Sequence, residues 1–271
     1  MRQFKIINAV GAEFDLNSLD SFLVNPDGLG YSNDSDFENV GYDYYITSTA
    51  ISQPKPHGTI KFTSYERYLE FIKFIQREPL KLCYTAAEAH YLDCVLGSLS
   101  KGEIESRKLS VTIQLIGISQ WYKYRKEAVG SEAVIGKYYP YQYAYTYTDK
   151  AQGDVHIVSD SALDSPAKLT ILGPCTNPKW VHYVNNKKES EGRVIATIPD
   201  NHRLVVSSEY PFSIKEYDEY NNEIADRYED SDFETERFVF LKHGENKVSF
   251  MHDGNEEMNA TAEGKIYYVS V

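Results

Sequence analysis

The chain has 271 residues, of which 28 are Lys or Arg and 40 are Asp or Glu, so its net charge at pH 7 is −12. Such an acidic chain is a poor ligand for DNA or RNA, because phosphate binding requires clustered cations. A hydrophobic content of 42% excludes a disordered chain, and three cysteines are too few for a disulfide scaffold. The most unusual feature is the presence of 23 tyrosines beside 12 phenylalanines and 2 tryptophans.

The sequence contains no recognisable targeting or membrane segment. Lys5, Asn8 and Glu13 interrupt the first apolar run, which is shorter than the roughly 7–15 apolar residues of a signal peptide. No stretch approaches the roughly 20 apolar residues of a transmembrane helix. We therefore expect synthesis and folding in a cytoplasm, with no membrane partner.

The three cysteines, Cys83, Cys94 and Cys175, are an odd number. In a protein that folds in a cytoplasm, we expect them to be small buried thiols. A bridge between Cys83 and Cys94 is the alternative.

The charge is unevenly distributed along the chain. Residues 1–126 contain 14 basic and 15 acidic residues, whereas residues 127–271 contain 14 basic and 25 acidic ones. Such an asymmetry indicates two domains, and the small, polar segment 127–136 has the composition of a connector. We therefore predict a mainly β protein with two β-sandwich-like domains, at residues 1–126 and 127–271.

Most of the first domain is predicted to be β-structure. Residues 42–49 are rich in aromatic and β-branched side chains, which favour strands. Residues 109–117 alternate between apolar and polar side chains, as a half-buried strand does. Asn-Pro-Asp-Gly at residues 25–28 has the composition of a turn. Further strands are expected at residues 4–8, 59–63, 80–84 and 91–98.

One amphipathic helix is predicted in the first domain, at about residues 64–77. Its apolar side chains recur at three- and four-residue spacing. Thr63 or Ser64 can cap its first turn, and Thr63 together with Glu66 fits a capping box. Pro79 is expected to end it.

The second domain is predicted to be a sandwich of short strands separated by turns. The strands are expected at residues 155–158, 167–172, 180–184, 193–198, 203–207, 238–241, 247–250 and 266–271. Tyrosines occupy every second position from Tyr139 to Tyr147, so in a strand all five point to one face. This stripe is interpreted either as part of the core between two sheets or as an exposed interface.

No arrangement of residues in the sequence is typical of an active site. The seven histidines are His57, His90, His156, His182, His202, His243 and His252. None of them forms an HExxH motif, and the sequence has neither a phosphate-binding loop nor a G-x-S-x-G motif. We expect each histidine to be on the surface or hydrogen-bonded in the interior. We therefore predict no catalytic, cofactor-binding or metal-binding residues, and no enzymatic activity.

The pentapeptide Asp-Ser-Asp-Phe-Glu occurs twice, at Asp34–Glu38 and Asp230–Glu234. In a loop, such alternating carboxylates can hold Ca²⁺. Neither copy has the glycine and the distal Glu of an EF-hand loop. Solvated polar loops are therefore the preferred interpretation, and calcium sites are the alternative.

Two further hypotheses concern carbohydrates. Trp121 and Trp180 are interpreted as core residues, and stacking on a sugar ring is the alternative. A module that attaches a particle to a cell wall through Trp180 and the tyrosine stripe is therefore a second functional hypothesis. A hydrolase that uses two carboxylates is a third, although 40 acidic residues produce many chance pairs.

Several segments follow one another in the order found in a known family. They are FLVNPDGLGY at residues 22–31, the strand 58–63, the helix 65–76, the strand 80–84, SLSKGEI at 98–104, the strand 109–117 and Trp121-Tyr122. This order resembles the N-terminal domain of distal tail proteins of long-tailed phages and prophages of Gram-positive bacteria. GPCTNPKW at residues 173–180, with the later segment 198–208, resembles the C-terminal domain of the same family.

The resemblance implies a structural protein of the virion, located in the tail tip or baseplate. Six copies would form a ring through their N-terminal domains and continue the tail tube. The ring would carry the tail-associated lysin and the receptor-binding proteins. The C-terminal domain would be a galectin-like β-sandwich, but His182 and Asn185 near Trp180 lack the accompanying arginines of a galectin sugar site. Binding of a cell-wall saccharide therefore rests on fold analogy alone.

Most of the net negative charge lies in one tract, at residues 209–236. This tract contains 11 acidic residues against Lys215 and Arg227. It also contains four tyrosines, Tyr210, Tyr217, Tyr220 and Tyr228. The resemblance does not cover it well. We predict that the tract is an exposed loop or hairpin that contacts a partner, with solvated surface as the alternative.

Overall fold

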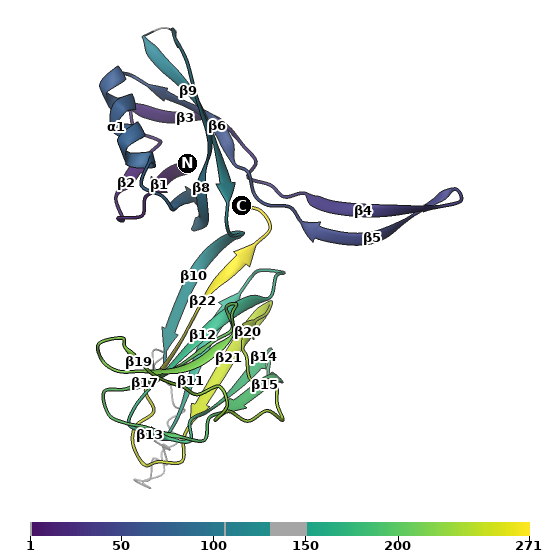
Figure 1. Ribbon diagram of the computed structural model, residues 1–271, viewed down its shortest axis with the longest axis vertical. Helices are drawn as coiled ribbons and strands as arrows, with labels where there is room; N and C mark the ends of the chain where they lie inside the picture. Colours follow the sequence, from purple (N-terminus) through teal and green to yellow (C-terminus); the bar gives the residue numbers. More distant parts are fainter. Residues whose placement is uncertain (1, 106, 131–150) are drawn as a thin grey trace, which may run out of the picture. The chain divides into compact units, whose positions relative to one another are not determined.

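The computed structural model describes residues 2–105, 107–130 and 151–271, and these residues are mainly β-structure with a single α-helix (Figure 1). The chain divides into two compact units. Unit 1 consists of Met1–Lys123 and Tyr267–Val271, and unit 2 consists of Tyr124–Ile266. No helix in the described ranges has the length and hydropathy required to span a bilayer. The tyrosine stripe from Tyr139 to Tyr147 lies outside the described residues.

Unit 1 is built on one strongly curved antiparallel sheet. The strands of unit 1 are β1 (Gln3–Ile7), β2 (Glu13–Asp15), β3 (Ser21–Asp27), β4 (Asn33–Val40), β5 (Asp43–Ile51), β6 (His57–Phe62), β7 (Leu80–Thr85), β8 (Ala89–Glu105), β9 (Lys108–Gly117) and the first residues of β10 (Trp121–Ala128), of which β4 and β5 form a separate two-stranded sheet. The main sheet has the order β2-β1-β7-β8-β9-β6-β3. The Leu23 amide donates to the Leu16 carbonyl at 2.8 Å. This bond brings the two ends of the sheet together, so that the sheet encloses a core.

The alternating patterns of the first half are confirmed. Leu109, Val111, Ile113 and Leu115 on β9 are all buried, whereas the residues between them are more exposed. Because successive side chains of a strand point to opposite faces, this alternation places one face of β9 in the core. The register of β9 with β6 and β8 follows from that face.

The predicted helix is present as α1 (Tyr65–Ile75), and it buries Phe71 and Ile75 in the core of unit 1. Ser64 is the N-cap, because its hydroxyl accepts the Arg67 amide at 3.1 Å. The expected capping box is not formed, since the Thr63 hydroxyl donates to Asp20 instead.

The turn predicted at residues 25–28 is wrong, because the chain does not reverse its direction there. Asn25 to Asp27 belong to β3, and the register of β3 with β6 shifts between Val24 and Asp27. Asn25 and Gly28 have positive φ values of 48° and 73°. Asn25 therefore lies in a bulge of the strand, and Gly28 follows the end of the strand.

Unit 2 contains two main antiparallel sheets. Its strands are the end of β10, then β11 (Gln152–Ser159), β12 (Ser165–Leu172), β13 (Cys175–Thr176), β14 (Lys179–Val184), β15 (Lys187–Arg193), β16 (Thr197–Ile198), β17 (Arg203–Ser207), β18 (Ser213–Tyr217), β19 (Glu223–Asp226), β20 (Phe240–Leu241), β21 (Gly244–Met251) and β22 (Ala260–Tyr268), whose last residues belong to unit 1. One sheet has the order β11-β21-β14-β15, and the other includes β19-β18-β17-β12-β22. Both contribute fully buried side chains, such as Trp180 and Phe250 from the first and Leu169 and Leu204 from the second.

Some predicted strands of the second half are misplaced. The strand expected at residues 193–198 is instead β15, at Lys187–Arg193, followed by the short β16. The strand expected at residues 266–271 is the last part of β22. β15, β18 and β19 are rich in charged residues. Because such a composition does not favour strands, the sequence did not predict them.

Candidate functional site

The residues that the sequence singled out for chemistry have structural partners. The partners are Asp27 for His57, Tyr268 for His90, Glu245 for His156, Asn246 for His182, Glu216 for His202, the carbonyl of Ser161 for His243 and the carbonyl of Glu256 for His252. Within the described ranges, no group of three or more His, Cys, Asp or Glu residues is arranged to hold a metal ion. The geometry of these side chains therefore supports anchoring roles.

The two acidic pentapeptides differ in structure. Asp34–Glu38 is part of β4, so the expectation of a loop is wrong for this copy. In the copy Asp230–Glu234, the Asp230 carboxylate pairs with Arg227 at 2.9 Å, and Asp232 accepts the Glu234 amide at 2.9 Å. These carboxylates therefore stabilise the local chain.

Both tryptophans are core residues, and the alternative that they stack on a sugar is wrong. Trp121 and Trp180 are 0% exposed. The Trp180 indole donates to the Arg237 carbonyl at 2.8 Å, so even its polar atom is used internally. The neighbouring His182 is also buried and bonds to Asn246 at 3.1 Å. This region of β14 presents no platform to a saccharide.

All three cysteines are buried free thiols, and the alternative bridge is absent. In the β7–β8 register, Cys83 lies opposite Tyr91, whereas Cys94 lies opposite Leu80. The two thiols are therefore offset along the ladder. Burial raises the pKa of Cys94 to about 12 and that of Cys175 to about 11, so both remain protonated at neutral pH.

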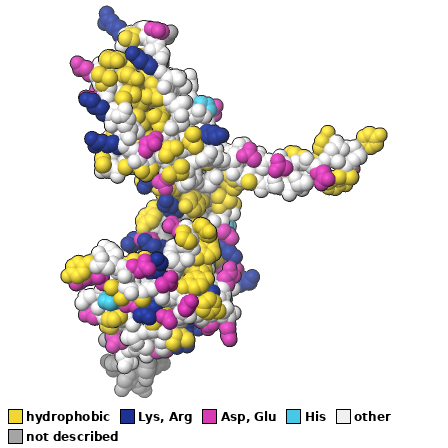
Figure 2. Space-filling view, viewed as in Figure 1, with side chains coloured by type: hydrophobic (Ala, Val, Ile, Leu, Met, Phe, Trp, Pro, Cys, Tyr) yellow, Lys and Arg dark blue, Asp and Glu magenta, His cyan; other side chains and the backbone are white. Residues whose placement is uncertain are grey.

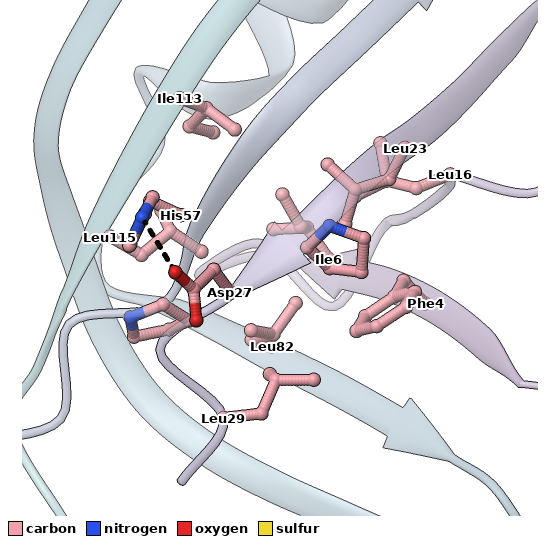
Figure 3. A pocket seen from close by; sticks show the side chains of 12 residues that line it. Phe4, Ile6, Leu16, Leu23, Asp27, Leu29, His57, Leu82, Ile113 and Leu115 are labelled. Atoms are coloured by element: carbon pink, nitrogen blue, oxygen red, sulfur yellow. Dashed lines mark ion pairs between the residues drawn. The ribbon is translucent and has the colours of Figure 1, made fainter.

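A small apolar cavity lies in the core of unit 1 (Figure 3). It is lined by core residues such as Phe4, Ile6 and Leu82, with the His57–Asp27 ion pair beside it at 3.6 Å. The cavity volume is about 20 Å³, which is room for about one water molecule. It is therefore too small to enclose an organic ligand.

The most unusual surface of unit 1 is the hairpin formed by β4 and β5, which we call the arm (Figure 1). Its two strands pair with each other and with no other described strand. Every residue of β5 is exposed, and so is every residue of β4 except the half-buried Ser35. A two-stranded hairpin alone is only marginally stable in water. Because both strands are exposed, the arm lacks the covering contacts that normally stabilise such a ribbon.

The register gives the arm two different faces. One face carries four carboxylates, Asp34, Asp36, Glu38 and Asp43. The other is uncharged, and its large side chains are Phe37, Tyr44, Ile46 and Ile51. The cross-strand bonds Ser48–Asp36 (2.7 Å) and Ser35–Thr49 (3.0 Å) lie on the acidic and the neutral face, respectively. Figure 2 shows acidic side chains along the arm and hydrophobic ones toward its tip.

Sequence reasoning missed this surface. Residues 33–40, NDSDFENV, contain few strand-forming side chains. The only signal was the pattern of β5, whose partner strand could not be identified. The spacing of Asp34, Asp36 and Glu38 at every second residue agrees with a strand, whereas the composition of the segment favours a polar loop.

The acidic tract 209–236 is an integral part of unit 2 and not a free loop. It contains the hairpin β18–β19, in which Ile214 and Glu216 are buried. The Glu216 carboxylate contacts Arg227 and His202, each at 2.6 Å. The tract therefore combines a packed inner side with exposed acidic and aromatic side chains.

Comparison with known proteins relates this architecture to phage tails. Residues 3–118 match the family model described as distal tail protein, N-terminal domain. The whole chain is similar to a chain of the phage P2 baseplate in its activated conformation with Ca, with 15% identity, 100% of both chains covered and a TM-score of 0.62. It is also similar to the SPP1 Dit protein, with 10% identity, 97% and 98% of the two chains covered and a TM-score of 0.63. A search of curated proteins found no significant match.

These matches define a class, the structural proteins of phage tails, which are located in the virion. Within that class, residues 3–118 match the N-terminal domain of distal tail proteins. The resemblance found in the sequence is thereby confirmed, as is the mainly β fold. The galectin-like nature of the second domain and an origin in phages of Gram-positive bacteria remain predictions.

Proposed function

We propose that this distal tail protein forms a ring of six copies in the tail tip of a phage of Gram-positive bacteria. Residues 1–126 would make the ring, and residues 127–271, as a galectin-like sandwich, would face the neighbouring tail proteins. The ring would continue the tail tube protein and carry the tail-associated lysin and the receptor-binding proteins. We infer that the chain acts through binding and has no catalytic role of its own.

The proposal for the ring rests on the exposed faces of the arm. Its neutral face exposes Phe37, Tyr44 and Ile46 at 59%, 70% and 65%, and aromatic residues are enriched at protein interfaces. Its other face is acidic, which keeps the uncovered ribbon soluble and opposes edge-to-edge pairing. A ribbon that lies with its neutral face on a second copy makes a head-to-tail contact, and repeated contacts of this kind close into a ring when the rotation between copies permits.

Two neighbouring tyrosines provide a matched test. Tyr44 lies on the neutral face and Tyr45 on the acidic face, and both are well exposed, at 70% and 57%. We expect Tyr44→Asp to abolish the ring, because it places a charge in the contact. We expect Tyr45→Asp to leave the ring intact. Light scattering gives the molar mass of each variant, and negative-stain electron microscopy reveals rings directly.

Two outcomes would contradict the proposal. One is a wild-type chain that stays monomeric, both alone and when mixed with the tail tube protein and the lysin. The other is an equal effect of the two tyrosine substitutions, since the ring would then not depend on the neutral face. Thermal unfolding of each variant shows that unit 1 is still folded.

A further inference from the structure

Unit 2 presents a continuous row of five aromatic rings, which we call the aromatic strip. Its members, in spatial order, are Tyr210, Phe212, Phe238, Tyr228 and Phe233. The distances between successive ring centroids are 6.5, 4.8, 6.3 and 5.8 Å. Because these separations are typical of packed aromatic pairs, the strip is one connected row of rings, made from two chain segments and exposed mainly toward its ends.

The strip is anchored at its centre and open toward its ends. Phe238 is only 9% exposed, and Phe212 packs against it. Tyr210, Phe233 and Phe212 are 93%, 58% and 47% exposed. Figure 2 shows hydrophobic side chains gathered on unit 2 near β20, where Phe240 also contacts Phe212. Exposed aromatic rings held on a packed base are typical of binding surfaces.

One cation of the chain already lies on the strip. The Arg237 guanidinium lies 4.0 Å from the ring centroid of Phe233 and 5.0 Å from that of Tyr228. It is held there by its bond to the Ser231 hydroxyl at 2.8 Å. The rings of Tyr210 and Phe212, at the other end, have no such cation within the described part of the chain. The strip thus accepts a guanidinium at one end and offers a free aromatic surface at the other.

The charges around the strip are unbalanced. The exposed carboxylates of Glu209, Glu229, Glu234 and Glu236 flank its members in the sequence, and none of them forms an ion pair with another described residue. Lys215 pairs with Glu223, and Arg227 pairs with Glu216 and Asp230, so Arg237 is the one cation of residues 209–237 that forms no ion pair with a described residue. A ligand of this surface is therefore favoured by positive charge and disfavoured by phosphate or carboxylate.

We propose that the aromatic strip is a docking site for an extended, basic segment of a partner protein. Arg or Lys side chains of that segment lie over the exposed rings of Tyr210 and Phe212, as Arg237 lies over Phe233, and pair with the free carboxylates. The inference rests on the proposed role of residues 127–271 in contacting other tail proteins, and it specifies the chemical character of the partner segment. An anionic cell-wall polymer does not fit this surface, because its charge would face uncompensated carboxylates.

A labelled decapeptide of alternating Arg and Ser is a direct probe for this site. Its binding to the full chain is measured by fluorescence anisotropy at about 150 mM salt, where long-range attraction to the acidic protein is screened. The double variant Tyr210→Ala/Phe212→Ala removes the free rings. Tyr220→Ala is the matched control, because Tyr220 is 75% exposed in the same acidic tract but outside the strip. All these variants have the same net charge.

We expect the double variant to bind the Arg-Ser peptide about tenfold more weakly than the wild type, and the Tyr220→Ala variant to bind it as well as the wild type. The decapeptide of alternating Glu and Ser should not bind. Equal binding by all three proteins would overturn the proposal, because it would indicate general electrostatic attraction. No binding of the Arg-Ser peptide, or tighter binding of the neutral saccharide cellohexaose, would overturn it as well.

The two proposals can fail separately. The peptide assay does not require a ring, and the ring assay does not use the aromatic strip. A chain that forms rings but does not discriminate between the peptides contradicts only the basic docking site. Circular dichroism and thermal unfolding of the double variant check its fold, and the single variant Tyr210→Ala, at an almost fully exposed residue, repeats the peptide test without removing the Phe212–Phe238 contact.

Discussion

Arg227 donates two hydrogen bonds to one carboxylate oxygen of Glu216, from Nη2 at 2.6 Å and from Nε at 2.9 Å. The other carboxylate oxygen contacts Nδ1 of His202 at 2.6 Å. Glu216 is 2% exposed, so its charge is tolerated in the interior only because these partners compensate it. The pair connects β18 to the chain that follows β19 and thereby holds the acidic tract against unit 2.

Arg227→Met should therefore destabilise unit 2 strongly. The substitution leaves a buried carboxylate with one partner fewer, which typically costs about 3 kcal/mol or more. Lys215→Met is the control, since it removes the exposed pair with Glu223 and should cost under about 1 kcal/mol. Urea unfolding of both variants measures the difference. Equal losses would show that the Glu216–Arg227 pair has no special role.

The same pair predicts a dependence on pH. Burial by itself would raise the pKa of Glu216, but the hydrogen bonds from His202 and Arg227 outweigh burial and hold the pKa below its ordinary value of 4.5. The folded state therefore binds the proton less readily than the unfolded state. The resulting stability is fully present above the unfolded pKa and is lost as the pH falls through the folded pKa.

We accordingly expect the stability difference between the wild type and the Glu216→Gln variant to be largest near neutral pH and to shrink in acid. Unfolding free energies measured from pH 7 down to about pH 3 test this. A difference that stays constant over that range would contradict the assignment.

Gly192 should not tolerate a side chain. A Cβ at this position would overlap the indole ring of Trp180, and the ring cannot move easily because its nitrogen is bonded to the Arg237 carbonyl. We expect Gly192→Ala to lower the stability of unit 2 by about 2 kcal/mol. Gly30→Ala is the control, since nothing lies within 4 Å of its Cβ position. Equal melting temperatures of the two variants would argue against this packing.

The helix cap offers a test on unit 1. The Ser64 hydroxyl accepts the Arg67 amide, so Ser64→Ala should cost about 1 kcal/mol. Thr63→Ala should cost less, because the Thr63 hydroxyl makes only an exposed bond to Asp20. Chemical unfolding followed by circular dichroism distinguishes the two. A larger loss for Thr63→Ala would indicate that the capping box forms after all.

Local patterns were sufficient for several parts of the fold. The three- and four-residue spacing before Pro79 predicted α1, and the alternation at residues 109–117 predicted the buried face of β9. In both cases, the periodicity of one segment records which of its sides is buried. The order of such segments also pointed to the family. The candidate surfaces could not be predicted in this way. The arm and the hairpin β18–β19 consist largely of polar residues, and their pairing partners cannot be identified from a local pattern.

The sequence by itself determined the mainly β composition, the helix and the absence of familiar catalytic motifs, because these depend on residue types and short spacings. Only the tertiary structure decided that Trp180 is enclosed, that the arm has one acidic and one neutral face, and that Tyr210 and Phe233 belong to one aromatic strip. A strand's register and a side chain's exposure depend on contacts between residues far apart in the chain. Those contacts are set by the packing of the whole unit, and no local pattern contains them.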